Sequence, residues 1–282
     1  MLTSATTPEA RRAFIAQAFR VVRVRQPILL TGYYAPELVA HRRPGGDFRH
    51  PIYGRPPDLV DVDPSVLDTC HCRAAAGRVI GDRLFPFFTR AEIDGGALAG
   101  RGLEIAWAND PLTLFALHVQ GSGQLVLDDG ARMGVHFAGT NGRPYRSIGR
   151  ALMERGLVPP AHATMPELRQ YLAGLAPVDQ ANLLEINERY TFFRLADHGP
   201  KGSFGVELTP GRSVATDPRL VPRGTLAYLR SGSATRFIVS HDTGAVVQGA
   251  HADLFFGAGA DAEDRAGRLK ENGSLYLLLP RS

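Results

Sequence analysis

Cysteine and lysine are both scarce in this sequence of 282 residues. The two cysteines, Cys70 and Cys72, flank His71, and no second cluster of metal-ligating residues accompanies them. A closed zinc site takes about four ligands, and a disulfide across one intervening residue would be strained. We therefore predict two free or loosely constrained thiols and no metal site, and the cysteines indicate no particular redox compartment.

A long hydrophobic run is also missing. No stretch approaches the roughly 18 apolar residues that a membrane-spanning helix needs. The first twenty residues place Glu9 and the pair Arg11–Arg12 ahead of no extended apolar segment, so no signal peptide is visible. Hydrophobic residues make up 44% and charged residues 21%, a balance typical of a globular protein whose length allows one large domain or two ordinary ones.

Excess charge is small. The formal net charge is +4 and the isoelectric point is about 9.3, with arginine supplying most of the positive charge. A mild basic excess favours an anionic polymer as partner. Basic runs with interleaved aromatic residues, which are typical of single-strand binding, are lacking. We therefore predict no nucleic-acid partner.

The first two thirds of the chain show mixed helix and strand patterns. Thr7 and Pro8 supply a helix N-cap and first position, and Asp128-Asp129-Gly130 predicts a hairpin turn. The patterns predict helices over residues 8–20, 148–155 and 177–189, and one from a capping box of Thr164 and Glu167 through 175. They also predict strands over 21–24, 28–36 and 103–107, and a long loop with short strand pieces over 41–64.

From Gly199-Pro200-Lys201-Gly202 onwards the character of the sequence changes. Short strand patterns spaced by glycine and proline continue to Pro280, with one helix expected over residues 260–270. This pattern favours a small closed β-barrel over a parallel sheet.

Two aspartates stand out in this last third. Residues 236–240 read as a short buried strand that ends at Asp242, and Asp253 lies between Ala252 and the bulky trio Leu254-Phe255-Phe256. A carboxyl group among apolar side chains is poorly solvated, which raises its pKa, and a raised pKa suits a general acid near neutral pH. The alternative is that both aspartates serve turns, since Asp beside Gly is common in turns.

Two glycine-rich loops and a tyrosine pair complete the candidates. Gln120-Gly121-Ser122-Gly123 has neither the ending of a P-loop nor the spacing of a dinucleotide fingerprint or a nucleophile elbow. This loop and Thr140-Asn141-Gly142 could bind the hydroxyls and amides of a sugar, or be ordinary turns. Tyr33 and Tyr34 point to opposite faces of a strand, so one could face a groove while the other packs, or both could pack.

Eight segments, in order, resemble the motifs of the membrane-bound lytic transglycosylase A family. They are Thr31–Pro36, Thr89–Ile93, Gln120–Gly123, Ala138–Gly149, Asn187–Phe193, Leu208–Asp217, Asp242–Gly244 and Asp253–Gly257. The last blocks resemble the three-aspartate module of this family. The resemblance spans nearly the whole chain, from about residue 10 to Pro280.

The resemblance implies a mainly β fold with two domains. A double-psi β-barrel would be built from residues 1–36 and 198–282. A second, β-rich α+β domain over residues 37–197 would be inserted into it, and a groove between the two would hold a glycan strand.

The resemblance also implies an activity that needs no cofactor. Family enzymes cleave the β-1,4 bond between N-acetylmuramic acid and N-acetylglucosamine in peptidoglycan and leave a 1,6-anhydro sugar. Asp253 would be the single acid/base, with Asp242 and Asp217 as supporting carboxylates. The substrate-binding residues would be Thr31, Gly32, Tyr33, Tyr34, Gln120, Gly121, Ser122, Gly123, Asn141, Gly142 and Tyr145.

Three alternatives stay open. A glycoside hydrolase of the same polymer would use Asp242 as a second carboxylate. An aspartic protease, suggested by Asp242-Thr243-Gly244, would have to dimerise because the chain has one such motif. An inert wall-binding module would bind peptidoglycan without cleaving it.

The expected partners follow from the same resemblance. They are peptidoglycan glycan strands, and other cell-wall enzymes are a further option. A monomer on the periplasmic side of the outer membrane is expected, in contact with the membrane only through a lipid anchor that this sequence does not show.

Overall fold

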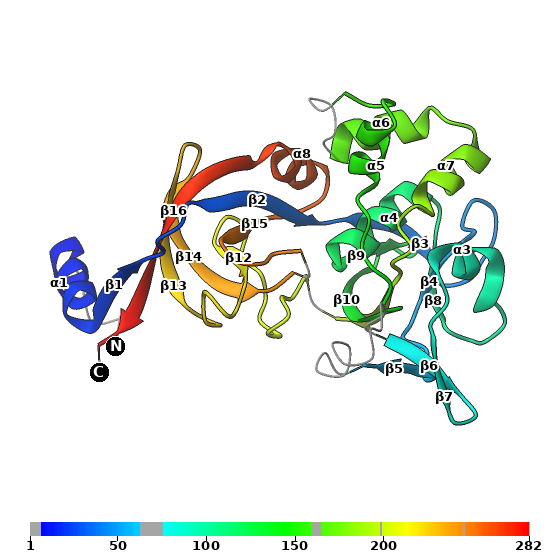
Figure 1. Ribbon diagram of the computed structural model, residues 1–282, viewed down its shortest axis with the longest axis horizontal. Helices are drawn as coiled ribbons and strands as arrows, with labels where there is room; N and C mark the ends of the chain where they lie inside the picture. Colours follow the sequence, from blue (N-terminus) through cyan, green and yellow to red (C-terminus); the bar gives the residue numbers. More distant parts are fainter. Residues whose placement is uncertain (1–6, 63–75, 160–164, 198, 245, 282) are drawn as a thin grey trace. The chain divides into compact units, whose positions relative to one another are not determined.

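Residues 7–62, 76–159, 165–197, 199–244 and 246–281 are described by the computed structural model of the chain (Figure 1). The chain divides into two compact units. The barrel unit contains Met1–Tyr33, Lys201–Gly257 and Arg265–Ser282, and the insert unit contains Tyr34–Pro200 and Ala258–Asp264. Strand β2 (Ile28–Ala35) therefore begins in the first unit and ends in the second.

A closed ring of six strands forms the barrel unit. The strands follow the order β16-β13-β14-β12-β15-β2, and β16 also pairs with β2, which closes the ring. Strand β1 (Phe19–Arg23) extends the sheet along β16. The other strands are β12 (Ser213–Thr216), β13 (Leu226–Ser231), β14 (Thr235–Asp242), β15 (His251–Ala258) and β16 (Lys270–Pro280). The predicted closed β-barrel is confirmed, and β2, from the first part of the chain, completes it together with strands from the last third.

Alternating apolar residues fill the barrel. Val214, Leu229, Leu254 and Leu275 come from four different strands and are each at most 1% exposed. Side chains of this size stabilise a fold by about 1.5–3 kcal/mol each when fully buried. Leu30 of β2 belongs to the same core, so the closed sheet brings residues from both ends of the chain together.

The insert unit contains two sheets. The larger has the order β11-β10-β9-β3-β8-β4 and the smaller the order β5-β6-β7. The predicted hairpin is confirmed: the Leu127 N–H donates to the Ala131 carbonyl across the turn, and β9 and β10 pair on either side. The strands are β3 (Glu37–His41), β4 (His50–Tyr53), β5 (Leu59–Asp61), β6 (Ala76–Ile80), β7 (Arg83–Pro86), β8 (Glu104–Ala108), β9 (Ser122–Leu127), β10 (Arg132–Thr140) and β11 (Thr191–Ala196).

The helices begin and end where capping chemistry allows. In α4 (Pro111–Gln120) the Asp110 carboxylate accepts hydrogen bonds from two backbone N–H groups, and Gly121 ends the helix with a φ of 79°. Thr7 caps α1 (Pro8–Ala18) in the predicted way. The other helices are α3 (Arg90–Glu92), which continues into a π-helical turn (Ile93–Ala97), α5 (Ile148–Glu154), α6 (Met165–Ala173), α7 (Pro177–Leu184) and α8 (Ala260–Arg268).

Several predicted helices are shorter than expected, and for two of them the structure shows why. Helix α1 ends at Ala18 because Phe19 already pairs with Pro280 in the sheet. Helix α7 ends at Leu184, and Asn187 then accepts hydrogen bonds from the backbone of Arg146 and Arg189, which fixes a loop where helix was expected.

Some predictions concern residues that are not described. Cys70, Cys72 and the capping residue Thr164 lie outside the described ranges. Within those ranges, none of the helices has the length and apolar character to cross a membrane.

Candidate active site

Asp253 lies on β15 beside strand β2 in the barrel unit. The Thr31 hydroxyl on β2 donates a hydrogen bond of 2.7 Å to Asp253 Oδ1. The same hydroxyl oxygen lies 2.8 Å from Nε2 of His251, two residues before Asp253 on β15. Residues far apart in the sequence thus meet because β2 and β15 are neighbours in the closed ring.

The surroundings of Asp253 favour its protonated form. Burial is the main cause that raises the pKa of Asp253 to about 6; the Thr31 hydrogen bond and the nearby His251 oppose the rise, and the Asp242 carboxylate adds to it. The adjacent Leu254 and Phe255 are each 1% exposed. The prediction that apolar neighbours raise this pKa is confirmed, and Asp253 is able to hold a proton close to neutral pH.

Asp242 ends strand β14 and has both carboxylate oxygens engaged. Oδ1 accepts hydrogen bonds from the backbone N–H of Ser203 at 2.7 Å and of Thr243 at 2.8 Å. Oδ2 accepts one from the Tyr33 hydroxyl at 3.1 Å. A carboxylate that accepts several N–H and O–H hydrogen bonds is held in one orientation. The arrangement suits a fixed negative charge that anchors loops.

Asp217 serves a separate turn of the barrel unit. Its carboxylate accepts hydrogen bonds from the Gly249 N–H at 2.7 Å and from the backbone and side chain of Arg219. These hydrogen bonds, with the Arg219 side chain first, hold the pKa of Asp217 far below its usual range. Asp217 thus connects the turn after β12 to the loop that leads into β15.

Tyr33 and Tyr34 point in opposite directions, as expected for a strand, but both are buried. Tyr33 is 9% exposed, bonds Asp242 and packs its ring 5.2 Å from that of Phe255. Tyr34 is 3% exposed in the insert unit, and burial followed by the Glu263 carboxylate raises the pKa of its hydroxyl. The packing alternative is correct for both rings, and Tyr33 belongs to the carboxylate cluster.

Gly32, between Thr31 and Tyr33, is required by close packing. A Cβ at Gly32 would lie 2.8 Å from the Ala266 Cα and from the Phe256 ring, closer than real Cβ contacts. Gly32 thus has a structural role, because it lets β2 pass against the end of α8, and its contact with substrate stays a prediction.

The loop Gln120–Gly123 packs against the segment that follows Tyr33. The Gln120 side-chain oxygen accepts a hydrogen bond from the Tyr34 N–H at 3.2 Å. A Cβ at Gly123 would lie 2.7 Å from the Pro36 carbonyl oxygen and from the Leu117 side chain, so only glycine fits there. Gly121 ends α4, and Ser122, half-buried, begins β9.

The second glycine-rich loop is internal except at its end. Asn141 is 0% exposed: its amide donates to the carbonyls of Phe88 and Glu188, and its oxygen accepts from the Tyr190 N–H. These hydrogen bonds give Asn141 a structural role, and its contact with a sugar stays a prediction. Gly142 has a φ of 73° and closely approaches the Ala76 backbone. Tyr145, in contrast, is 38% exposed and accessible to a ligand.

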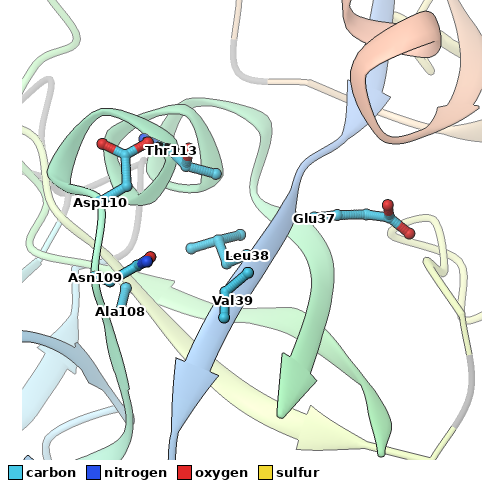
Figure 2. Close-up of a pocket in the computed structure, with 7 residues that line it drawn as sticks. All are labelled: Glu37, Leu38, Val39, Ala108, Asn109, Asp110 and Thr113. Carbon is cyan, nitrogen blue, oxygen red and sulfur yellow. Dashed lines mark hydrogen bonds between the residues drawn. The ribbon is translucent and has the colours of Figure 1, made fainter. Parts of the chain in front are cut away.

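A cavity of about 200 Å³ lies in the insert unit, away from these residues. Figure 2 shows Asn109 and Asp110 on one side of β3 and Glu37 pointing away on the other. Asp110 caps α4 and Glu37 bonds Arg132 at 2.6 Å, so both acidic groups of the lining already have partners. None of the predicted site residues lines this cavity.

His251 is the residue of this cluster that the sequence reasoning did not select. Its signal was its position: residues i and i+2 of a strand share one face, so His251 and Asp253 had to lie together once residues 251–258 were taken as a strand.

Comparisons with known proteins agree with this geometry. Residues 29–194 match the MltA specific insert domain and residues 212–279 match the 3D domain. The membrane-bound lytic murein transglycosylase A of Vibrio cholerae is 33% identical over 264 residues, which cover 89% of this chain and 65% of that protein. The chain thus spans about 65% of the length of this curated relative.

Solved structures share the fold. A membrane-bound lytic murein transglycosylase from Agrobacterium tumefaciens matches with a TM-score of 0.90 and 34% identity, over 99% of this chain and 81% of that one. Escherichia coli MltA with bound chitohexaose matches with a TM-score of 0.81 and 26% identity, over 98% and 79%. These likenesses confirm the predicted fold class, a mainly β chain with a double-psi β-barrel and an inserted domain.

Proposed function

This chain belongs to the membrane-bound lytic murein transglycosylase A family, and we propose that it is a peptidoglycan lytic transglycosylase. It cleaves the β-1,4 bond between N-acetylmuramic acid and N-acetylglucosamine and forms a 1,6-anhydromuramic acid end. The observation that carries this proposal is the desolvated Asp253, whose pKa of about 6 lets one carboxyl group act first as acid and then as base.

The reaction needs one titrating group because the nucleophile is part of the substrate. Protonated Asp253 gives its proton to the glycosidic oxygen as the bond to C1 breaks. The resulting carboxylate then takes the proton of the muramyl 6-hydroxyl while that oxygen bonds to C1. Asp253 ends in its starting state and no water enters. Intramolecular attack of this kind can reach effective molarities on the order of 10⁵ M or more.

Asp242 has the environment of a support rather than of a nucleophile. Its three hydrogen bonds, from Ser203, Thr243 and Tyr33, engage both oxygens and hold the charge in place. A hydrolase would require a second carboxylate that is free to attack C1 or to activate water. The negative charge of Asp242 instead raises the pKa of Asp253 and keeps the acid protonated.

The same proposal covers substrate contacts and location. The E. coli relative was crystallised with chitohexaose, a linear sugar chain, and we assign glycan strands to this chain as substrate. Tyr145 is the exposed aromatic residue of the predicted set and is assigned a contact with sugar. The relatives' names describe membrane-bound enzymes, which supports a periplasmic, membrane-associated location.

The test is digestion of purified peptidoglycan sacculi, followed by mass spectrometry of the soluble products. The proposal predicts fragments that end in 1,6-anhydromuramic acid, and Asp253→Asn should release none while still binding sacculi. Asp128→Asn is the matched control because Asp128 is an exposed turn residue. Reducing ends would identify a hydrolase, binding without release an inert module, and pepstatin-sensitive peptide cleavage a protease.

A further inference from the structure

His251, Thr31 and Asp253 form one continuous chain of hydrogen-bonding atoms in the barrel unit. His251 Nε2 lies 2.8 Å from Thr31 Oγ1, which lies 2.7 Å from Asp253 Oδ1. At the other end of the imidazole ring, Nδ1 lies 3.3 Å from the Val246 carbonyl oxygen. The carboxyl group is thus linked to a second titratable group through one hydroxyl.

The chemistry of these atoms restricts where the protons lie. A backbone carbonyl only accepts, so the hydrogen bond to Val246 requires a proton on Nδ1 of His251. The Thr31 hydroxyl has one proton to donate. When Asp253 is charged, that proton points to Oδ1, and Nε2 must donate to the Thr31 oxygen, which makes His251 an imidazolium ion.

Protonation of Asp253 on Oδ1 reverses both hydrogen bonds. The carboxylic acid then donates to the Thr31 oxygen, and the Thr31 hydroxyl donates to the lone pair of Nε2 on a neutral imidazole. The two arrangements carry the same number of protons and differ in which end of the chain holds one. Each arrangement gives every donor and acceptor in this series of hydrogen bonds a partner, so the Thr31 hydroxyl can couple the charge of His251 to that of Asp253.

We propose that His251 is a positioning residue that couples its proton to the acid/base Asp253 through the Thr31 hydroxyl. This proposal rests on the function proposed above. As Asp253 passes its proton to the glycosidic oxygen, the Thr31 hydroxyl turns to donate to the new carboxylate, and His251 Nε2 takes up one proton from solvent and donates to the Thr31 oxygen. The imidazolium stabilises the charge that develops on Asp253, and His251 returns its extra proton to solvent when Asp253 takes the proton of the muramyl 6-hydroxyl.

The neighbouring elements supply few other charges. Asp242 at the end of β14 raises the pKa of Asp253. Tyr33 on β2 donates to Asp242, and burial, followed by the Asp242 carboxylate, holds the pKa of the Tyr33 hydroxyl well above its usual range. Asp217 fixes the loop before β15 through the Gly249 N–H, and the His251 N–H donates to the Gly249 carbonyl. This loop carries Val246, the acceptor for Nδ1.

The first test is an NMR titration of the full chain with ¹⁵N-labelled histidine, which requires no catalysis. In the wild type the Nε2 and Nδ1 signals of His251 report its charge between about pH 4 and pH 9. Asp253→Asn removes the negative partner and should move the ¹⁵N signals of His251 toward those of a neutral ring. Thr31→Val should uncouple the two groups, and Thr31→Ser should retain the coupling.

The second test is the pH dependence of kcat/KM with solubilised glycan strands. His251→Gln should lower kcat by about 10- to 100-fold, the effect of losing a hydrogen bond to a charged group. Because the charge of His251 lowers the pKa of Asp253, its removal should move the alkaline limb of the profile to higher pH. His41→Gln in the insert unit is the matched control and should change neither value.

The outcomes separate the two proposals. Coupled titration in a protein that yields reducing ends would refute the transglycosylase and leave the His251 coupling standing. Anhydro products with a His251 titration that is unchanged in Asp253→Asn would refute the coupling alone. A loss of activity in a folded His251→Gln protein without any shift of the alkaline limb would show a merely structural role and would also overturn it.

Discussion

Replacing Asp253 by asparagine should make the protein more stable at neutral and alkaline pH while it abolishes turnover. The pKa of Asp253 is about 6 in the folded chain against an ordinary value of 3.8. A group whose folded pKa is raised stabilises the fold below its unfolded pKa, and this contribution is lost as the pH rises through the folded pKa. Ionising Asp253 between about pH 4 and pH 7 therefore costs stability, at most about 3 kcal/mol.

Asparagine has nearly the same shape, can still accept the Thr31 hydrogen bond and never ionises. The variant should thus match the wild type near pH 4 and exceed its unfolding free energy by up to about 3 kcal/mol near pH 8. Urea unfolding followed by circular dichroism at several pH values measures the gap. Hydrogen exchange of the peptide covering β15 (His251–Ala258) shows whether this stability difference arises in the barrel unit.

Asp128→Asn again serves as control, because an exposed turn carboxylate should show no such pH-dependent gap. A constant difference between Asp253→Asn and the wild type at all pH values would refute the desolvation argument. So would a variant that is less stable than the wild type near pH 8, since that result would mean that the folded protein stabilises the charged carboxylate.

Three further predictions concern other residues of the predicted set. Gly142→Ala should destabilise the insert unit by about 2 kcal/mol or more, because φ is 73° and the new Cβ would meet the Ala76 backbone. Urea unfolding followed by Trp107 fluorescence measures the loss of stability, and an unchanged unfolding midpoint would contradict the prediction. Asp217→Asn should be less stable than the wild type at neutral pH, and the difference should shrink as the pH falls below about 4, because only the ionised carboxylate is stabilised. Melting temperatures of both proteins across this pH range measure the difference, and a difference that does not change with pH would contradict the prediction. Tyr145→Ala should raise KM for glycan strands several-fold without changing the melting temperature, whereas Asn141→Ala should lower the melting temperature; the reverse pattern would return the sugar contact to Asn141.

The local parts of the fold were predictable because local chemistry decides them. The N-cap at Thr7, the hairpin at Asp128–Gly130 and the strand that ends at Asp242 each depend on neighbours within a few residues. The raised pKa of Asp253 was predictable for the same reason, since its apolar neighbours adjoin it in the sequence.

The contacts that complete the site were not predictable from local pattern. Thr31 and Asp253 are 222 residues apart, and Tyr33 and Asp242 are 209 residues apart. Only closure of the six-stranded ring brings β2 beside β15 and makes Thr31 a partner of the acid. The order of strands in a barrel is not encoded in the period of any one strand.

The burial of polar side chains also could not be predicted from the sequence. Asn141 has the chemistry of a sugar-binding side chain, yet its amide satisfies the carbonyls of Phe88 and Glu188, which arrive from other parts of the chain. A polar residue in a glycine-rich loop has the same pattern whether it faces solvent or holds the loop from inside.

The central claim is that one carboxyl group cleaves the glycan with the substrate's own hydroxyl as nucleophile. Digestion of sacculi in ¹⁸O-labelled water, with mass spectrometry of the first products, tests it most directly. We expect fragments that are lighter than the hydrolysis product by one water and that carry no ¹⁸O. New reducing ends labelled with ¹⁸O would show that water attacks C1, and would contradict the assignment of Asp253 as the single acid/base.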